Sequence, residues 1–151
     1  MTSNETKKAA RGDIDVRLLS PDDAVLFDGI ADEVFDDPVD TVMAKEFLSD
    51  PRHHISAALD GDRLVGFASA LHYVHPDKPN ELWINEVGVA PDYQMRGIGR
   101  RLVKRLLDHG RELGCREAWV LTEHPNQAAR ALYRSAGGSE SEALMVSFKL
   151  T

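Results

Sequence analysis

Glycine and arginine residues gather in the segment VGVAPDYQMRGIGRRL, which lies between an apolar run and a helical pattern. A helix N-terminus binds anions because its first backbone N–H groups are free and the helix dipole is positive there. Gly97 and Gly99 would leave that backbone approachable, and Arg96, Arg100 and Arg101 would add positive charge suited to phosphate oxygens. The segment therefore predicts a phosphate or pyrophosphate site. A dinucleotide-binding loop is excluded because Leu102 stands where the third glycine is needed, and a P-loop is excluded because Gly-Lys-Ser/Thr is absent.

A carboxylate lies within the apolar run that precedes this loop. Strict alternation along WINEVGV places Leu82, Ile84 and Glu86 on one face of a strand. Burial raises the pKa of a carboxyl group that has no partner, and such a group is a candidate general base. The alternative interpretation is a structural acid in a salt bridge, and a β-bulge would reverse the face of Glu86.

Charge is divided unevenly along a chain whose net charge is −7. Seven basic residues and two acidic ones lie between Gln94 and Arg116, whereas ten acidic residues and one basic one lie between Pro21 and Asp50. The division suggests one site for an anion and another for a cation, although each cluster alone could be an ordinary solvated surface.

The elements that must position these residues follow from the apolar spacing and the turn residues. Ser20, Pro21 and Asp23 have the pattern of a helix start, and apolar residues at helical spacing continue from there to Phe35. Asp60-Gly61-Asp62 predicts a hairpin turn. The expected strands are 14–19, 55–59, 63–71, 82–89, 117–122 and 144–150, and the later helices are 40–48, 97–113 and 126–136. This order predicts an α/β domain with a mixed sheet.

The remaining sequence limits the class of protein. Residues 1–12 are expected to be a flexible tail and residues 13–151 one domain. No apolar run approaches the roughly 20 residues of a membrane span and no signal peptide is recognisable, so we expect a cytoplasmic protein. The single cysteine, Cys115, is expected to be a packing residue. The six histidines show no metal-ligand spacing and are expected on the surface or in a substrate loop, so no metal is predicted.

The run QMRGIG from Gln94 to Gly99 resembles the Gln/Arg-x-x-Gly-x-Gly/Ala motif of the GNAT superfamily of N-acetyltransferases. VGVAP before it and NQAARALYRSAGG after it also resemble segments of that superfamily, and the likeness extends from about Ile14 to Leu150. The resemblance implies an α/β (α+β) GNAT fold, with a mixed, mostly antiparallel sheet flanked by about four helices. It also implies an N-acetyltransferase that uses acetyl-CoA.

The resemblance assigns roles to matching residues. It implies that the pantetheine arm of coenzyme A lies along the strand backbone and that the pyrophosphate binds at the loop and helix start. Asn126 would contact the acetyl-CoA arm, and Tyr133 would donate a proton to the leaving thiolate. Asn126 could instead be only a helix N-cap, and Tyr133 a half-buried core aromatic. The residues expected to bind the cofactor are Val87, Gly88, Val89, Gln94, Met95, Arg96, Gly97, Ile98, Gly99, Arg100 and Asn126.

The acceptor would be an amine, because an amine that attacks a thioester must first lose a proton, for which Glu86 is the candidate base. Within the superfamily the sequence is most similar to type I aminoglycoside 3-N-acetyltransferases, through EVFDD, the acid before Val-Gly-Val and an acidic final hairpin, SESEALMVSF. We therefore expect a polycationic small molecule, such as an aminoglycoside antibiotic, and antibiotic resistance as the biological role. The acids expected to bind it are Glu33, Asp36, Asp37, Glu140 and Glu142.

Other classes of function stay open at this point. A protein or peptide N-acetyltransferase is one alternative, and a non-catalytic acyl-CoA-binding module is another. A nucleic-acid partner is disfavoured, because the basic residues of 96–105 lie on one helix without interleaved aromatic residues. No membrane partner is expected, and the resemblance is compatible with a homodimer.

Overall fold

The computed structural model describes residues 13–151, so the tail expected at 1–12 lies outside the described residues. A five-stranded sheet has the strand order β1-β2-β3-β4-β5. Adjacent strands are antiparallel except β4 and β5, which are parallel. The strands are β1 (Asp15–Leu18), β2 (His53–Asp60), β3 (Arg63–Tyr73), β4 (Glu81–Val89) and β5 (Glu117–Val120). The helices are η1 (Pro21–Gly29), α2 (Thr41–Ser49), η2 (Pro91–Tyr93), α3 (Ile98–Glu112) and α4 (Gln127–Ser135).

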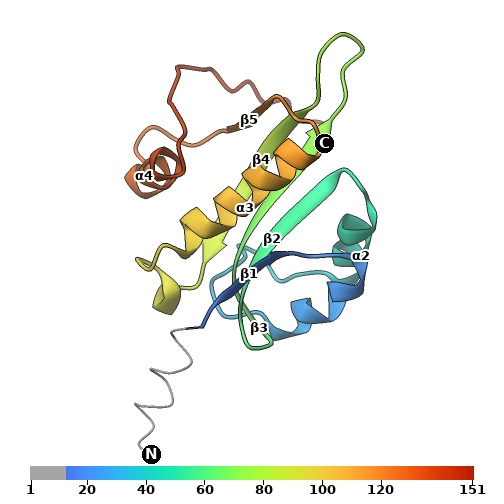
Figure 1. Ribbon diagram of the computed structural model, residues 1–151, viewed down its shortest axis with the longest axis vertical. Helices are drawn as coiled ribbons and strands as arrows, with labels where there is room; N and C mark the ends of the chain where they lie inside the picture. The colour runs from blue at the N-terminus through green and yellow to red at the C-terminus, as the bar shows by residue number, and fades with distance from the viewer. Residues whose placement is uncertain (1–12) are drawn as a thin grey trace, which may run out of the picture.

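Helices cover the two faces of the sheet differently. Helix α3 packs on one face, against β1 to β4, while η1 and α2 pack on each other and against β3 and β2. Figure 1 shows α3 crossing the sheet, with α2 and α4 at opposite sides of the molecule. The mixed sheet and its helices confirm the predicted fold class.

The face under α3 holds the densest part of the core. Leu82, Leu102 and Leu106 are fully buried there. Gly110 lets the helix approach the sheet, because an added Cβ would lie 3.1 Å from a methyl carbon of Leu82. The hydroxyl of Ser56 donates a hydrogen bond of 2.9 Å to the Leu102 carbonyl, which satisfies a buried polar group in the same layer.

A row of three histidines also lies between α3 and the sheet. His54 Nε2 is 2.7 Å from His72 Nδ1, and His54 Nδ1 is 3.1 Å from His109 Nε2. Burial and the neighbouring imidazoles lower the pKa of His54 to about 4. The expectation that the histidines lie on the surface or in a substrate loop is therefore wrong for His54, which is buried. Spacing along the chain could not show it, because the three rings come from β2, β3 and α3.

The first helix differs from the expected one. The predicted start is confirmed, because the Ser20 N–H donates a hydrogen bond of 2.8 Å to the Asp23 carboxylate. The segment is nevertheless a 3-10 helix, and it ends at Gly29. Val34 and Phe35 lie beyond it in a loop, where both pack against the core and Phe35 stacks on Phe67 with ring centroids 4.0 Å apart. Apolar spacing alone cannot distinguish such packing from a continued helix.

The predicted strand at 144–150 is wrong. Residues 138–151 have no regular secondary structure, so no acidic hairpin forms there. Its apolar side chains are exposed, from 72% for Val146 to 94% for Leu144. The edge of β5 that faces away from β4 stays unpaired in the described residues, so alternation along 144–150 is not by itself enough to form a strand. Among those residues, no helix is long and apolar enough to cross a membrane.

Candidate active site

A β-bulge in β4 determines where Glu86 points. Ser69 pairs with Glu86 while Ala70 pairs with Ile84, so Asn85 is the extra residue. The inserted residue reverses the alternation, and Glu86 lies on the face opposite to Leu82 and Ile84. The predicted shared face for these three side chains is therefore wrong. Glu86 instead faces away from α3, on the side of the sheet where η1 and α2 pack.

A loop from the N-terminal half crosses β4 next to this residue. A Cβ at Gly88 would collide with the carbonyl oxygen of Val34 and would lie 2.9 Å from a ring carbon of Phe67. The loop can therefore lie directly on the β4 backbone only because residue 88 is glycine. The crossing brings Asp36 and Asp37 to Glu86, and Asp36 is close enough to hydrogen-bond with its carboxyl group.

The surroundings of Glu86 favour its protonated form. Burial raises the pKa of this carboxyl group above its usual range, and the charge and hydrogen bond of Asp36 and the charge of Asp37 raise it further. A carboxyl group with a raised pKa is better matched to accept a proton near neutral pH than a solvated one. Glu86 is therefore a candidate general base.

Beyond the bulge, β4 continues without its parallel neighbour. The pairing between β4 and β5 ends at Ile84 and Val120, whereas β4 runs on to Val89. In the described structure, the backbone of Val87–Val89 therefore has no partner strand on the β5 side, and an extended ligand can add there as a strand does. This is the segment that sequence analysis assigned to the cofactor arm.

The loop after β4 forms the start of α3. Met95 and Gly97 both have positive φ, 60° and 76°, and Gln94 Nε2 donates a hydrogen bond of 3.0 Å to the Val89 carbonyl. No atom lies within 4 Å of a Cβ built on Gly97, so the space in front of the helix start is open. The first N–H groups of α3 have no acceptor within the helix. Together these features fit a pyrophosphate group.

The arginines and the second glycine of this loop have different roles. Arg101 donates a hydrogen bond of 2.9 Å to the Ile14 carbonyl, so its expected place beside the anion is wrong. The Arg96 guanidinium lies 5.2 Å from the ring centroid of Tyr93. Gly99 faces Leu132 of α4, 3.3 Å from an added Cβ, so it permits close packing of α3 and α4 rather than opening the anion site. Arg96 and Arg100 are left as the basic side chains nearest the helix start.

The two residues assigned from the later motif lie on α4. Asn126 caps the helix, because its side chain accepts a hydrogen bond of 3.1 Å from the Ala129 N–H. Tyr133 lines a cavity of about 290 Å³ between α3, α4, β5 and the first half of β4, and Ile84 and Val120 also line this cavity. Burial raises the pKa of the Tyr133 phenol, so it keeps its proton at neutral pH and can donate it.

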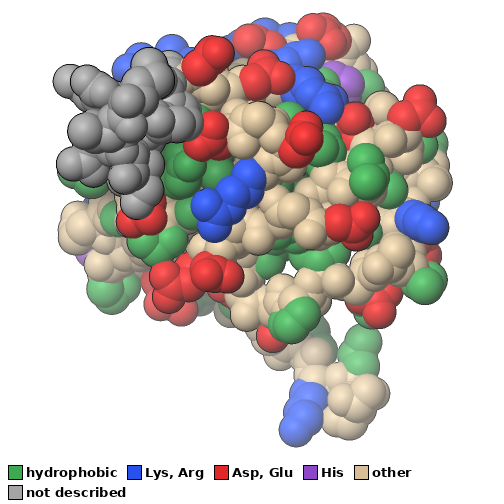
Figure 2. All heavy atoms as spheres, turned by 90° about the horizontal axis from the view of Figure 1, so that it is seen from below, with side chains coloured by type: hydrophobic (Ala, Val, Ile, Leu, Met, Phe, Trp, Pro, Cys, Tyr) green, Lys and Arg blue, Asp and Glu red, His purple; other side chains and the backbone are tan. Residues whose placement is uncertain are grey.

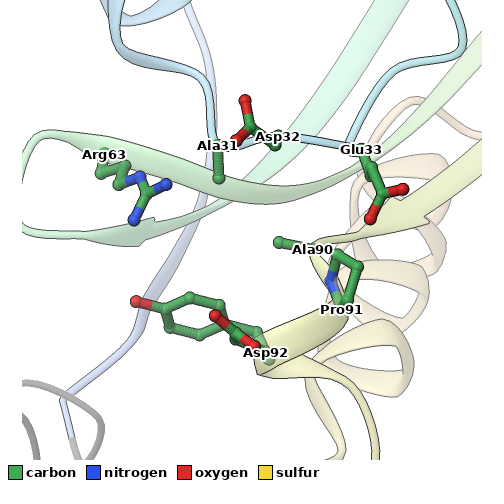
Figure 3. A pocket seen from close by; sticks show the side chains of 8 residues that line it. Ala31, Asp32, Glu33, Arg63, Ala90, Pro91 and Asp92 are labelled. Atoms are coloured by element: carbon green, nitrogen blue, oxygen red, sulfur yellow. The ribbon is translucent and has the colours of Figure 1, made fainter.

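The acids expected to bind the acceptor do not form one cluster. Asp36 and Asp37 lie beside Glu86. Glu33 lines a separate cavity of about 230 Å³ with Arg63 and Asp92, and Figure 3 shows its side chain extending toward Pro91. Figure 2 shows acidic side chains spread among basic and apolar ones on the face in view rather than gathered in one patch.

Glu140 and Glu142 follow α4 and are exposed. The guanidinium of Arg130 makes two hydrogen bonds to the Glu140 carboxylate, of 3.0 and 2.8 Å, and the pKa of Glu140 is lowered as a result. Glu140 is thus held by α4 rather than beside Asp36.

Sequence analysis gave the β-bulge that reverses Glu86 only as an alternative, which the structure confirms at Asn85, and it missed the crossing of Val34 over Gly88. Gly88 carried a signal for this crossing, because glycine inside a strand often marks a close approach of another backbone. No comparable signal marked the bulge. In the range 13–151, no cluster of His, Cys, Asp and Glu is arranged to hold a metal ion.

The chain belongs to the acetyltransferase (GNAT) family, whose sequence pattern matches residues 22–137. The superfamily identified from the QMRGIG segment is therefore confirmed, while the closer likeness to type I aminoglycoside 3-N-acetyltransferases stays a prediction. The N-alpha-acetyltransferase RimI of Mycobacterium tuberculosis is 41% identical to this chain over 104 residues, which are 69% of this chain and 63% of that relative. The chain thus spans less than two thirds of this relative's length.

Two solved structures resemble the fold closely. One is an aminoglycoside acetyltransferase from an uncultured soil metagenomic sample, in complex with sisomicin. It superposes with a TM-score of 0.77 at 18% sequence identity, and the match covers 91% of this chain and 97% of that chain. The other is the aminoglycoside N-acetyltransferase AAC(6')-Iy, in complex with the bisubstrate analogue CoA-S-monomethyl-acetylneamine. It superposes with a TM-score of 0.76 at 20% sequence identity, and the match covers 92% of this chain and 99% of that chain. At these identities the likeness shows the fold alone.

Proposed function

We propose that this protein is an acetyl-CoA-dependent N-acetyltransferase that acts on a primary amine. One observation carries the proposal: Glu86 and Tyr133 lie on opposite sides of the sheet, at the point where β4 parts from β5. A group that accepts a proton and a group that donates one thus flank the same opening. This arrangement suits a transfer in which an amine arrives from one side and a thiolate leaves on the other.

The open helix start and the unpaired part of β4 fit coenzyme A. The backbone of Gln94–Gly99 and the side chains of Arg96 and Arg100 would hold the pyrophosphate, with Gly97 leaving it room. The backbone of Val87–Val89 would pair with the pantetheine arm, and Asn126 would lie beside it. When bound, acetyl-CoA supplies the acetyl thioester.

Two side chains of this chain would move protons. Glu86 takes a proton from the acceptor ammonium group, directly or through a water molecule, which frees the nitrogen lone pair for attack. Its raised pKa suits that step near neutral pH. Tyr133, protonated because its pKa is raised by burial, donates a proton to the departing sulfur.

The acceptor is a polycationic small molecule such as an aminoglycoside. Asp36 and Asp37 support this choice, because both place negative charge next to Glu86 and would concentrate a cation there. A protein N-terminal α-amine is the second candidate, and it is favoured by the identity of 41% to an N-alpha-acetyltransferase.

A thiol-release assay tests the proposal. The protein is supplied with acetyl-CoA and, in separate reactions, sisomicin, spermidine and a peptide with a free N-terminal amine, and mass spectrometry locates the acetyl group. Thiol release with an acetylated amine supports the activity, and the acceptor with the highest kcat/KM identifies the class. Binding of coenzyme A without turnover of any acceptor would instead show a non-catalytic acyl-CoA-binding module.

A further inference from the structure

Two tryptophans stack on each other beside the candidate active site. The parallel register of β4 and β5 places Trp83 opposite Trp119, with ring centroids 5.1 Å apart and planes 11° from parallel. Both side chains are partly exposed, and neither belongs to the cluster of residues that packs the main core. The pair therefore forms an aromatic surface on the sheet rather than part of its interior.

This surface lies on the same face as Glu86. On β3, Leu71 pairs with Trp83 and Ser69 pairs with Glu86, and residues two apart on one strand share a face. At roughly 3.4 Å per residue, the two pairs are about 7 Å apart along the sheet. Helix α3, which packs against β4, lies on the other face, and both tryptophans stay partly exposed on the face where the acceptor must reach Glu86.

Hydrogen bonds fix the orientation of Trp119, on which Trp83 stacks. Trp119 Nε1–H donates to the Tyr73 hydroxyl at 2.9 Å, and that hydroxyl lies 3.5 Å from Glu81 Oε1. The other oxygen of Glu81 lies 3.3 Å from His75 Nε2. An aromatic surface that is held in place loses little entropy when a ligand stacks on it.

Negative charge flanks the tryptophans along the sheet. Glu81 pairs with Glu117 in the register, two residues before the tryptophans and on the same face. Beyond the tryptophans lies Glu86, with Asp36 beside it. Tryptophan is the aromatic side chain that attracts cations most strongly, so a stacked pair between carboxylates suits an ammonium-bearing group.

We propose that the Trp83–Trp119 pair binds a second ammonium-bearing part of a polyamine acceptor while the reacting amine lies at Glu86. The inference rests on the proposed function and adds the specificity determinant for the acceptor. It accounts for two tryptophans that stay partly exposed next to a general base. A stacked pair that only stabilises the β4–β5 pairing is the competing role.

Fluorescence tests this binding without turnover, because Trp83 and Trp119 are the only tryptophans in the chain. Sisomicin is titrated into the protein, with coenzyme A present, while tryptophan emission is recorded. A saturable change whose midpoint agrees with the KM for sisomicin supports the proposal. Constant emission at saturating sisomicin, shown to be bound by calorimetry, overturns it. This readout stands apart from catalysis, so absence of thiol release with every amine would refute the proposed function alone.

Kinetics of Trp119→Leu and Trp83→Leu separate binding from stability. We expect KM for sisomicin to rise about 3- to 30-fold, the range for one or two cation–π contacts, with KM for acetyl-CoA unchanged. KM for a peptide with a lysine at its second position should rise similarly, whereas KM for the same peptide with alanine there should change less than about twofold. Equal effects on both peptides, or on acetyl-CoA, would show a structural role and overturn the proposal.

Matched variants separate ring stacking from the loss of a hydrogen bond and from the loss of any exposed ring. Trp119→Phe keeps an aromatic ring but removes the N–H donor, so it should recover most of the sisomicin affinity if ring stacking is the cause. Phe148→Leu removes an aromatic ring that is 81% exposed in the C-terminal segment, and should leave all these values unchanged. If deleting residues 144–151 changes the tryptophan emission as much as saturating sisomicin does, the C-terminal segment occupies the surface and the proposal fails.

Discussion

The carbonyl oxygen of Val34 lies where a side chain at Gly88 would begin. The contact joins the loop after η1 to the part of β4 that has no partner on the β5 side, and it brings Asp36 to Glu86. One glycine thus links the proposed cofactor strand to the proposed acceptor loop.

Gly88→Ala should therefore affect both stability and acceptor binding. The added methyl group must displace the loop, at a cost of about 1–3 kcal/mol of unfolding free energy. Displacing Asp36 should also raise KM for a polycationic acceptor, measured by thiol release beside thermal unfolding. Gly114→Ala is the control, because that glycine has a φ of 78° but no neighbour within 4 Å of its Cβ. It should lower the Tm without changing KM, and equal KM values for both variants would refute the positioning role of Gly88.

Glu86→Gln should lower kcat by roughly 10² or more, because an amide cannot accept the proton of the acceptor ammonium. Steady-state kinetics at saturating acetyl-CoA measure the effect. The Tm should change little, since glutamine keeps the size of the side chain. A kcat within about twofold of the original would remove Glu86 from the role of base.

Asp36→Asn should shift the pH dependence of turnover. The negative charge of Asp36 raises the pKa of Glu86, so its removal lowers that pKa. The base is then deprotonated at lower pH, and the acidic limb of the kcat profile should move toward lower pH. Asp32→Asn is the control, because Asp32 lines the cavity near Arg63 rather than facing Glu86. A shift of the limb in the opposite direction would contradict the assignment.

Tyr133→Phe should reduce kcat by about 10² while leaving coenzyme A affinity nearly unchanged. The phenol is expected to donate a proton to the departing thiolate, whereas the residue also lines the cavity between α3, α4, β5 and the first half of β4. Calorimetry with coenzyme A and kinetics on the same preparation separate the two contributions. Loss of binding with kcat preserved would indicate a purely structural tyrosine.

The histidine row predicts acid sensitivity of the fold. The pKa of His54 is about 4 in the folded protein and near 6.5 when the chain is unfolded, so the unfolded state binds the extra proton first. The contribution of neutral His54 to the free energy of unfolding is complete above about pH 6.5 and should fall as the pH is lowered toward 4. The titratable groups whose charges affect the pKa of His54 are His109, His72, His53 and Asp50. Glu112 lies beside His109.

Thermal unfolding at a series of pH values measures this effect. His54→Leu should flatten the dependence between pH 6.5 and 4, although it lowers the Tm at neutral pH by removing two hydrogen bonds. His124→Gln, at an exposed position, should leave the dependence unchanged. An unchanged slope in the His54 variant would show that other groups cause the acid sensitivity.

Local signals predicted most elements, and contacts between distant segments account for what they missed. The hairpin turn, the cap of α4 and the glycine before α3 depend on a few neighbouring residues. The face of Glu86 depends on one inserted residue whose effect appears only when β3 is paired with β4. Likewise, the exposed segment after α4 shows strand alternation but pairs with no strand among the described residues, because alternation does not specify a pairing partner.

The early end of β5 has a consequence for how such a protein can change. Val87 and Val89 offer main-chain groups, which every amino acid except proline supplies alike, so substitutions at these two positions need not alter what pairs with them. In the proposed function, the loop that carries Asp36 would contact the acceptor through side chains instead, so a substitution there would alter that contact. Substitutions in one short loop would then change the acceptor, while the donor of the acetyl group is retained.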